Sequence, residues 1–145
     1  MRAKILLVDD DPAVRKMVGR LLTEAGYLVL PARDEQGALA LASATKIDLV
    51  LLDLNLAGKD GWNTYETLTR DDPLLPVIII TGRGNQLFTS LAAGAGALME
   101  KPIDAAKLLE AVDALLNEPA ETRLARLAGK SAEFYHWPIE HPTKK

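Results

Sequence analysis

The chain has 145 residues, of which 48% are apolar and 26% are charged, and its formal net charge is −3. These values predict one domain with an ordinary apolar core and a short extension, and they argue against bulk affinity for nucleic acid. The sequence contains no cysteine, which excludes disulfides, thiolate zinc sites and cysteine nucleophiles. No apolar run approaches the ~18 residues of a membrane span, and none fits a signal peptide, so we expect a cytoplasmic protein.

Short apolar runs alternate with segments of helical spacing along the first 118 residues. The runs predict five strands, at 4–9, 27–32, 48–53, 76–81 and 96–100. The segments between and after them predict five helices, at about 12–25, 34–45, 61–70, 84–93 and 105–116. The apolar face of the first helix is formed by Val14, Met17, Val18, Leu21 and Leu22. Asp11 and Asp104 are placed to cap the first and last helices, and Gly26 is placed to end the first.

The segment around the third predicted helix contains two glycines and two large aromatic residues. We interpret Gly58 and Gly61 as turn residues that lead into the helix. Trp62 and Tyr65 lie three positions apart on the helix, and we interpret them as packing residues rather than as a binding surface.

Two of the predicted strands are apolar on both faces. The runs "LVLL" at 49–52 and "VIII" at 77–80 are typical of a parallel sheet that is covered by helices on each side. Right-handed crossovers between such strands predict a doubly wound α/β fold of three layers. In folds of this kind the functional site lies at the carboxyl ends of the strands.

Polar side chains stand at the ends of four of these strands. Strand one is followed by Asp9 and Asp10, strand three ends in Asp53, strand four ends in Thr81, and Lys101 follows strand five. Three carboxylates at one rim repel one another unless a cation offsets them, and Mg²⁺ prefers carboxylate oxygens. An ammonium and a hydroxyl beside them suit phosphoryl transfer, in which an aspartate can itself be the nucleophile. We therefore choose Asp53, the central acid, as the candidate nucleophile.

Four segments together resemble the receiver domain of two-component response regulators, in its stand-alone form. They are "VDDDPAVR" at 8–15, "LVLLDLNLAGKDG" at 49–61, "VIIITG" at 77–82 and "MEKPID" at 99–104. Their order and spacing match the family over residues 1–118. The resemblance implies a flavodoxin-like fold, with a five-stranded parallel sheet in the order 2-1-3-4-5 and five helices.

The resemblance also implies a metal site. Asp53 becomes the phosphoacceptor and a ligand of Mg²⁺ or Mn²⁺. Asp10 becomes a direct ligand, Asp9 a ligand through a water molecule, and Asn55 a ligand through its backbone carbonyl. The third acid of the run, Asp11, falls outside this set, which agrees with its interpretation as a helix cap.

Further roles carried over by the resemblance concern the phosphoryl group. Thr81 would move to bond it and Lys101 would pair with it. Gly82 leaves room for a phosphodonor or an attacking water, and we expect Arg83 to modulate hydrolysis. The family's usual aromatic residue, three positions before the lysine, is replaced here by Leu98, so we expect the relay from Thr81 to be altered.

The implied function is that of a phosphorylation switch rather than of an enzyme with turnover. A sensor histidine kinase or a histidine phosphotransfer protein would pass a phosphoryl group to Asp53. The chain would assist both this transfer and its reversal, and it would then bind a downstream protein. Contacts with nucleic acid or membrane are not expected, and a homodimer is left open.

Two alternatives to this function remain at the level of the sequence. The chain could be the receiver fragment of a longer DNA-binding or ATPase regulator. It could also be a phosphatase of the haloacid dehalogenase type with Asp53 as nucleophile, but such enzymes need a second acid two residues later, where this chain has Asn55.

The composition changes after Glu118. Residues 119–145 are predicted to be an extension, partly helical or irregular, that holds no effector domain. This extension either lies on the domain or docks onto a partner or a second copy of the chain.

Overall fold

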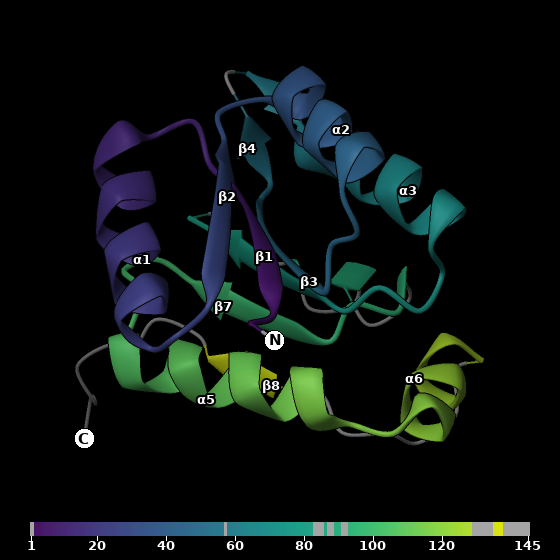
Figure 1. Cartoon of the computed structure of the whole chain (residues 1–145). Coiled ribbons are helices and arrows are strands. Elements are labelled where there is room, and N and C mark those ends of the chain that lie inside the picture. The colour runs from purple at the N-terminus through teal and green to yellow at the C-terminus, as the bar shows by residue number, and fades with distance from the viewer. Residues whose placement is uncertain are drawn as a thin grey trace, which may run out of the picture.

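Strands and helices alternate along the chain in a computed structural model that describes most of its length (Figure 1). The described residues are 2–56, 58–82, 86, 89–90, 93–128 and 135–137. The strands are β1 Lys4–Val8, β2 Leu28–Ala32, β3 Leu49–Asp53, β4 Asn55–Leu56, β5 Lys59–Asp60, β6 Val77–Thr81, β7 Ala97–Glu100 and β8 Tyr135–Trp137. The helices are α1 Pro12–Glu24, α2 Glu35–Ala44, α3 Gly61–Asp71, α5 Ala105–Asn117 and α6 Ala120–Leu127.

One parallel sheet forms the centre of the molecule, with strands in the order β2-β1-β3-β6-β7-β8. Its first five strands reproduce the predicted order 2-1-3-4-5, so the flavodoxin-like fold is confirmed. The sixth strand, β8, was not predicted, and it pairs in parallel with β7 so that His136 lies opposite Leu98. The short strands β4 and β5 form a separate antiparallel pair directly after β3.

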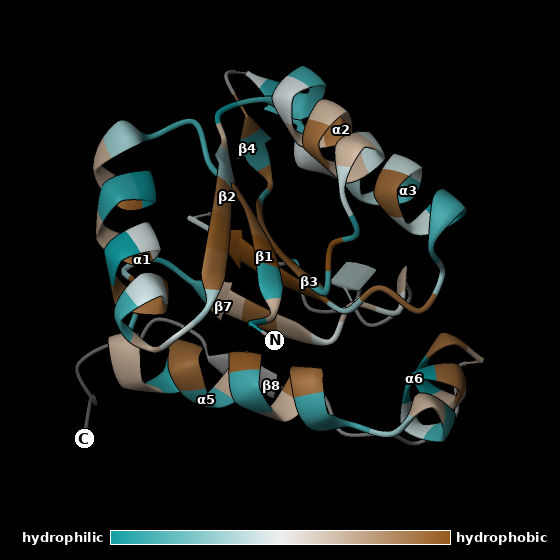
Figure 2. Cartoon of the chain, in the orientation of Figure 1, coloured by the Kyte–Doolittle hydropathy of each residue, from teal (hydrophilic) through white to brown (hydrophobic). Residues whose placement is uncertain are grey.

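Alternate residues of the central strands face two separate helical layers. Leu6 and Val8 pack in a cluster with Tyr65 and Leu68 of α3, whereas Ile5 and Leu7 pack with side chains of α1 and α5. Figure 2 shows the apolar strands between these layers. Each residue step along a strand reverses the direction of the side chain, which is why strands apolar on both faces can fill two cores at once.

Four helices begin directly after an aspartate whose side chain accepts a hydrogen bond from a backbone N–H of the first turn. The caps are Asp11 for α1, Asp34 for α2, Asp60 for α3 and Asp104 for α5. The predicted caps of the first and last helices are therefore confirmed. The predicted end of the first helix is also confirmed, because Gly26 follows it with a φ of 98°.

The first helix buries fewer side chains than its apolar pattern predicts. Met17 was expected on the buried face of the first helix, but it is 52% exposed, because only Val18 and Leu22 of that face point directly at the sheet. The predicted helix at 84–93 falls largely outside the described residues, of which it contains only 86, 89, 90 and 93. No helix in the described ranges combines the length and the apolar character needed to cross a membrane.

A buried ion pair attaches α6 to the end of α5. Arg126 donates to both carboxylate oxygens of Glu118 at 2.8 and 2.5 Å, and both side chains are less than a tenth exposed. Arg123 lies 3.4 Å from the same carboxylate and donates to the backbone carbonyl of Leu115 at 2.9 Å. The side chain of Leu127 lies against Gly94, just before β7. The start of the predicted extension is thus helical and packs on the domain.

Candidate functional site

The carboxyl ends of four neighbouring strands bring the predicted site residues to one edge of the sheet. Asp53 is the last residue of β3 and is in register with Ile80 of β6. Thr81, the next residue of β6, is fully buried and is in register with Glu100 of β7. The backbone N–H of Lys101 continues this pairing by donating to the carbonyl of Thr81 at 2.8 Å. Parallel pairing in this register fixes the backbone position from which each of these side chains projects.

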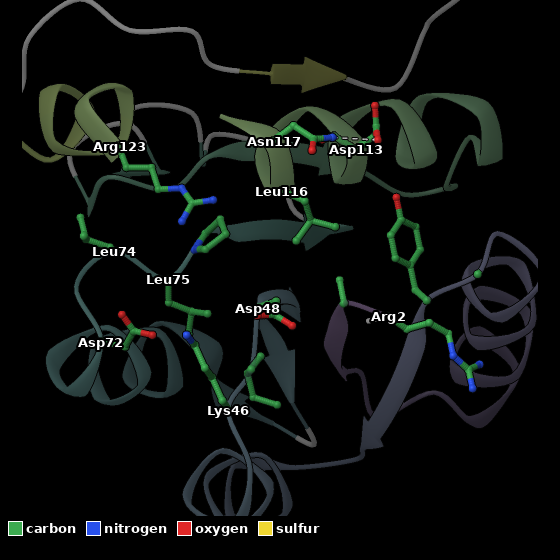
Figure 3. Close-up of a pocket in the computed structure, with 15 residues that line it drawn as sticks. Arg2, Lys46, Asp48, Asp72, Leu74, Leu75, Asp113, Leu116, Asn117 and Arg123 are labelled. Carbon is green, nitrogen blue, oxygen red and sulfur yellow. Dashed lines mark hydrogen bonds between the residues drawn. The ribbon is translucent and has the colours of Figure 1, made fainter. Parts of the chain in front are cut away.

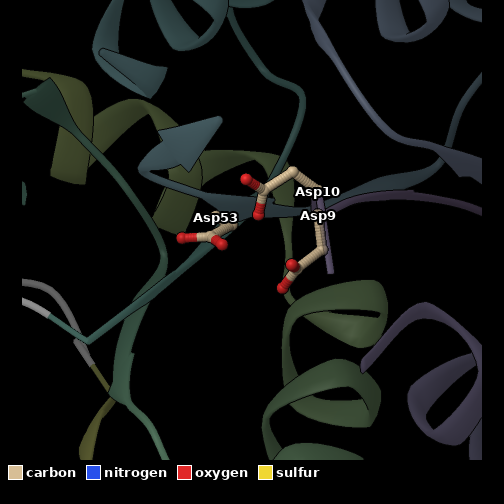
Figure 4. Close-up of side chains that lie close together, drawn as sticks. All are labelled: Asp9, Asp10 and Asp53. Carbon is tan, nitrogen blue, oxygen red and sulfur yellow. The ribbon is translucent and has the colours of Figure 1, made fainter. Parts of the chain in front are cut away.

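Three carboxylates form a cluster at this edge (Figure 4). Oxygens of Asp9, Asp10 and Asp53 all lie within 4.8 Å of one another. Asp9 is 1% exposed and Asp53 is 2% exposed, whereas Asp10 reaches solvent. Acids this close and this buried destabilise the fold unless positive charge or N–H donors face them.

Backbone N–H groups hold two of the three acids in place. The N–H of Asp11 donates to Asp9 Oδ1 at 2.9 Å, and the N–H of Asn55 donates to Asp53 Oδ1 at 3.0 Å. Each bond spans two residues, the local pattern by which an aspartate shapes the turn after a strand. The backbone of Asn55 thus contacts the Asp53 carboxylate through its N–H, and its role as a carbonyl ligand stays a prediction.

Lys101 supplies the positive charge at the centre of the cluster. Its Nζ lies 3.0 Å from Asp53 Oδ2 and 3.2 Å from Asp9 Oδ2. Burial works to lower the pKa of this ammonium, but the hydrogen bonds and charges of Asp53 and Asp9 outweigh burial and raise the pKa above its ordinary value. Lys101 therefore stays protonated and bridges the two buried acids.

Lys101 compensates the buried charge of Asp9 only in part. Burial raises the pKa of Asp9, and the nearby charge of Asp53 raises it further, while the Asp11 N–H and Lys101 only partly oppose them. The cluster thus combines a buried acid that is only partly compensated with a set of hard oxygen donors, which is the chemistry that Mg²⁺ or Mn²⁺ requires. The residues present fit a divalent cation held by Asp9, Asp10 and Asp53.

Arg15 is a further residue at this edge, which was not singled out from the sequence. Its Nη1 donates to the backbone carbonyl of Asp9 at 2.6 Å and so braces the turn that carries the acids. The signal was available, because Arg15 lies on the first helical turn after Asp11, where a long side chain can reach back to the preceding strand end. Asp11 itself accepts from the N–H of Ala13 and caps the helix.

The loop after Asp53 is closed by a tight contact with α3. Gly61 donates from its N–H to the carbonyl of Leu54 at 2.7 Å, and a Cβ on Gly61 would lie only 2.6 Å from the carbonyl oxygen of Asp53. Gly58, with a φ of 81°, is a turn residue as expected. Gly61 was interpreted in the same way, but it begins α3, and glycine is needed there for the close approach to Asp53.

The residues expected to modulate the site are only partly described. Gly82 follows Thr81 and is exposed, with open space where a Cβ would stand. Leu98 is 2% exposed within β7 and packs in the core beside Tyr65. Arg83 lies outside the described residues.

A cavity of about 810 Å³ lies away from this cluster, at the opposite edge of the sheet (Figure 3). Its lining includes Arg2 and Asp48, which precede β1 and β3, and Arg123 of α6. Both acidic and basic side chains line it, and Asp48 accepts a hydrogen bond from the backbone N–H of Lys4 at 2.8 Å. The candidate site is therefore the shallow acidic cluster and not this larger cavity.

Comparison with known families agrees with the fold and with the acidic cluster. The model of the response regulator receiver domain matches residues 5–113, three quarters of the chain. The chain therefore belongs to the response regulator receiver domain family, a family of signalling switches.

Curated relatives include longer regulators. The chain is 39% identical over 114 residues to the nitrogen assimilation regulatory protein NtrX of Azorhizobium caulinodans, which corresponds to 75% of this chain and 25% of that protein. It is 34% identical over 120 residues to the transcriptional regulatory protein GlrR of Escherichia coli (strain K12), covering 81% of this chain and 27% of that protein. The chain thus spans about a quarter of the length of these two relatives.

Solved receiver domains match this chain over almost their whole length. A CheY-like receiver domain protein of Methanospirillum hungatei JF-1 superposes with a TM-score of 0.78 at 31% identity, covering 83% of this chain and 98% of that one. The receiver domain of NtrX from Brucella abortus gives a TM-score of 0.73 at 32% identity, with 79% and 99% covered.

Proposed function

We propose that this chain accepts a phosphoryl group on Asp53 and signals through the resulting change. The observation that carries the proposal is the placement of the Asp53 carboxylate. One oxygen is held by the Asn55 N–H, the other by Lys101, and two further acids lie alongside. This arrangement orients a carboxylate for in-line attack and supplies charge for the incoming group.

The proposed donor is the phosphohistidine of a sensor histidine kinase or of a histidine phosphotransfer protein. An oxygen of Asp53 attacks phosphorus, a P–O bond forms, the P–N bond breaks, and the imidazole leaves with the electron pair and takes up a proton. Lys101 then turns its ammonium to the new phosphoryl oxygens, and the Thr81 hydroxyl bonds another of them. Gly82 keeps the approach open, and Arg83 modulates the later hydrolysis.

A divalent cation fits this scheme. Asp9, Asp10 and Asp53, with the backbone carbonyl of Asn55, would hold Mg²⁺ or Mn²⁺. Such an ion, when bound, offsets the negative charge of the carboxylates and of the transferred group.

Residues 1–118 form the proposed switch, and 119–145 form the extension. The phosphorylated form would bind a downstream protein. A second candidate is that the chain acts as the receiver part of a longer regulator, because two of the curated relatives, GlrR and NtrX, are about four times as long as the matched segment.

The test is incubation with Mg²⁺ and acetyl phosphate, followed by intact mass spectrometry. We expect one added phosphoryl group on the wild type and none on Asp53→Asn. The matched control is Asp71→Asn, which removes an exposed carboxylate outside the cluster and should still be labelled. Label that persists in Asp53→Asn would refute the assignment. Repeated release of phosphate from a small phosphomonoester would favour a phosphatase instead.

A further inference from the structure

Helix α3 is joined to the backbone of Asp53 at its first residue. Gly61 bonds to the Leu54 carbonyl and leaves no room for a side chain against Asp53. Any displacement of the Asp53 turn is therefore felt by α3, and any restraint on α3 is felt by that turn.

Two aromatic side chains on the same helix hold the chain that follows Thr81. Trp62 Nε1 donates to Gln86 Oε1 at 3.0 Å, and the Tyr65 hydroxyl donates to the carbonyl of Ala93 at 2.6 Å. The two rings also contact each other edge to face, with centroids 5.4 Å apart. The aromatic pair thus bonds to this segment at two points, seven residues apart.

The two points belong to one bonded run. The Ser90 N–H donates to the Gln86 carbonyl, and the Ala95 N–H donates to the Ser90 carbonyl. Gln86 lies five residues after Thr81 in the sequence, so its hydrogen bond with Trp62 anchors a residue that is close in sequence to Thr81. Leu98 packs in the same apolar cluster as Tyr65 but has no polar atom with which to hold the run.

Burial makes the Tyr65 bond specific. Tyr65 is 4% exposed, and burial raises its pKa to about 12, so its hydroxyl stays protonated and donates throughout the neutral range. A buried hydroxyl that lost its acceptor would remain unsatisfied, so the bond resists small movements of the run.

We propose that Trp62 and Tyr65 are positioning residues for the phosphoryl transfer: they tie Gln86 and Ala93, which follow Thr81 in the sequence, to the helix that begins at the Asp53 turn, and they oppose the approach of Thr81 to a phosphoryl group. This inference rests on the proposed function. It assigns to α3 a restraint through hydrogen bonds, which the apolar side chain of Leu98 cannot form. Phosphorylation and the two aromatic-donated hydrogen bonds are then in competition, and weakening the bonds favours phosphorylation.

The test uses Trp62→Phe and Tyr65→Phe, which keep a ring in place and remove only the donor. With acetyl phosphate and saturating Mg²⁺, we expect each variant to be labelled about fivefold faster than the wild type, as loss of one net hydrogen bond implies. Gln86→Leu removes the acceptor of the Trp62 bond and should match Trp62→Phe. The double variant Trp62→Phe/Gln86→Leu should be labelled no faster than either single variant, because both changes remove the same hydrogen bond. Thr67→Val, which removes a hydroxyl bonded within α3 to Asn63, is the control and should leave the rate unchanged.

Thermal unfolding of the same variants separates positioning from packing. A purely structural role would lower the unfolding temperature and leave the labelling rate at the wild-type value, and that result would overturn the inference. A wild type that is labelled while the phenylalanine variants react at its rate refutes only this inference. A wild type that takes no label refutes the proposed function, and the inference with it.

A spectroscopic readout completes the test. The chain has two tryptophans, and with Trp137→Phe the remaining emission comes from Trp62. We expect phosphorylation to change this emission as the indole N–H leaves Gln86, and we expect Tyr65→Phe to shift the unphosphorylated spectrum part of the way. Emission that stays constant through full labelling would count against the inference.

Discussion

Two buried charge clusters in this chain differ in composition. At the carboxyl edge of the sheet, the carboxylates of Asp9 and Asp53 share the ammonium of Lys101, and the carboxylate of Asp10 lies beside them. At the junction of α5 and α6, one carboxylate, that of Glu118, faces two guanidinium groups.

The difference distinguishes a candidate binding site from a structural ion pair. At the junction, Arg126 bonds to both oxygens of Glu118, a closed geometry that satisfies the acid. At the carboxyl edge, Asp9 has a raised pKa even with Lys101 beside it, so its ionised form is not fully compensated. A buried acid whose ionised form is only partly compensated, beside further oxygen donors, favours a cation as ligand. Substitutions at both clusters test this contrast.

The largest effect is expected at the junction. Glu118→Gln leaves Arg126 buried without a carboxylate and should lower the free energy of unfolding by about 3 kcal/mol. Chemical denaturation measures this change, which should be independent of Mg²⁺. Glu121→Gln, on the exposed first turn of α6, is the matched control and should change little. Equal, small effects of both substitutions would show that the buried ion pair contributes nothing special.

The next effect concerns the cation. Mg²⁺ at about 100 times its dissociation constant should raise the free energy of unfolding of the wild type by about 2.7 kcal/mol. Asp10→Asn removes one ligand and should abolish most of this gain at the same concentration, whereas Asp71→Asn should retain it. Denaturation curves with and without Mg²⁺ give both values. A wild type indifferent to Mg²⁺ would contradict the metal site.

The third prediction concerns a substitution that should raise, not lower, the free energy of unfolding. Asp9→Asn removes a buried charge that is disfavoured at neutral pH, so without Mg²⁺ it should stabilise the chain. The pKa of Asp9 is raised in the fold, so its contribution is fully present below its ordinary pKa of 3.8 and is lost as pH rises through the raised pKa. The advantage of Asp9→Asn should accordingly grow as pH rises from about 4 to 7. A pH-independent difference between the two chains would be inconsistent with this cause.

The smallest effect separates the third aspartate from the other two. Asp11→Ala removes the cap of α1 and should cost about 1 kcal/mol. The stabilisation by Mg²⁺ should be the same in this variant as in the wild type. A loss of that stabilisation would place Asp11 within the metal site and not beside it.

Most of the fold and the core of the site could be predicted from local signals. Strands such as 49–52 are apolar on both faces, and acids such as Asp53 stand where those strands end, so pattern and topology together brought distant residues to one edge. The caps at Asp11 and Asp104 were predictable for the same reason, because the capping bond is made within a few residues of the cap.

Other features depend on contacts that no local pattern encodes. The pairing of β8 with β7 and the ion pair of Glu118 with Arg126 arise only when the extension folds back on the domain. Gly61 was interpreted as a turn residue because the sequence gives no sign of what requires a glycine there. The requirement is the close approach of the Asp53 backbone, which lies eight positions earlier. The interpretation of Trp62 and Tyr65 as packing residues is confirmed, but their hydrogen bonds to Gln86 and Ala93 could not be predicted, because those partners lie on another part of the chain.

The addition of β8 has a consequence for how copies of this chain can meet. Among the described residues, the margins of the sheet are β2, whose Pro31 has no N–H to offer a neighbouring strand, and β8, a strand of three residues. Both devices protect a sheet from edge-to-edge aggregation. Concentrated solutions of the folded chain should therefore be poor seeds for cross-β assembly, and recognition is left to helices and loops.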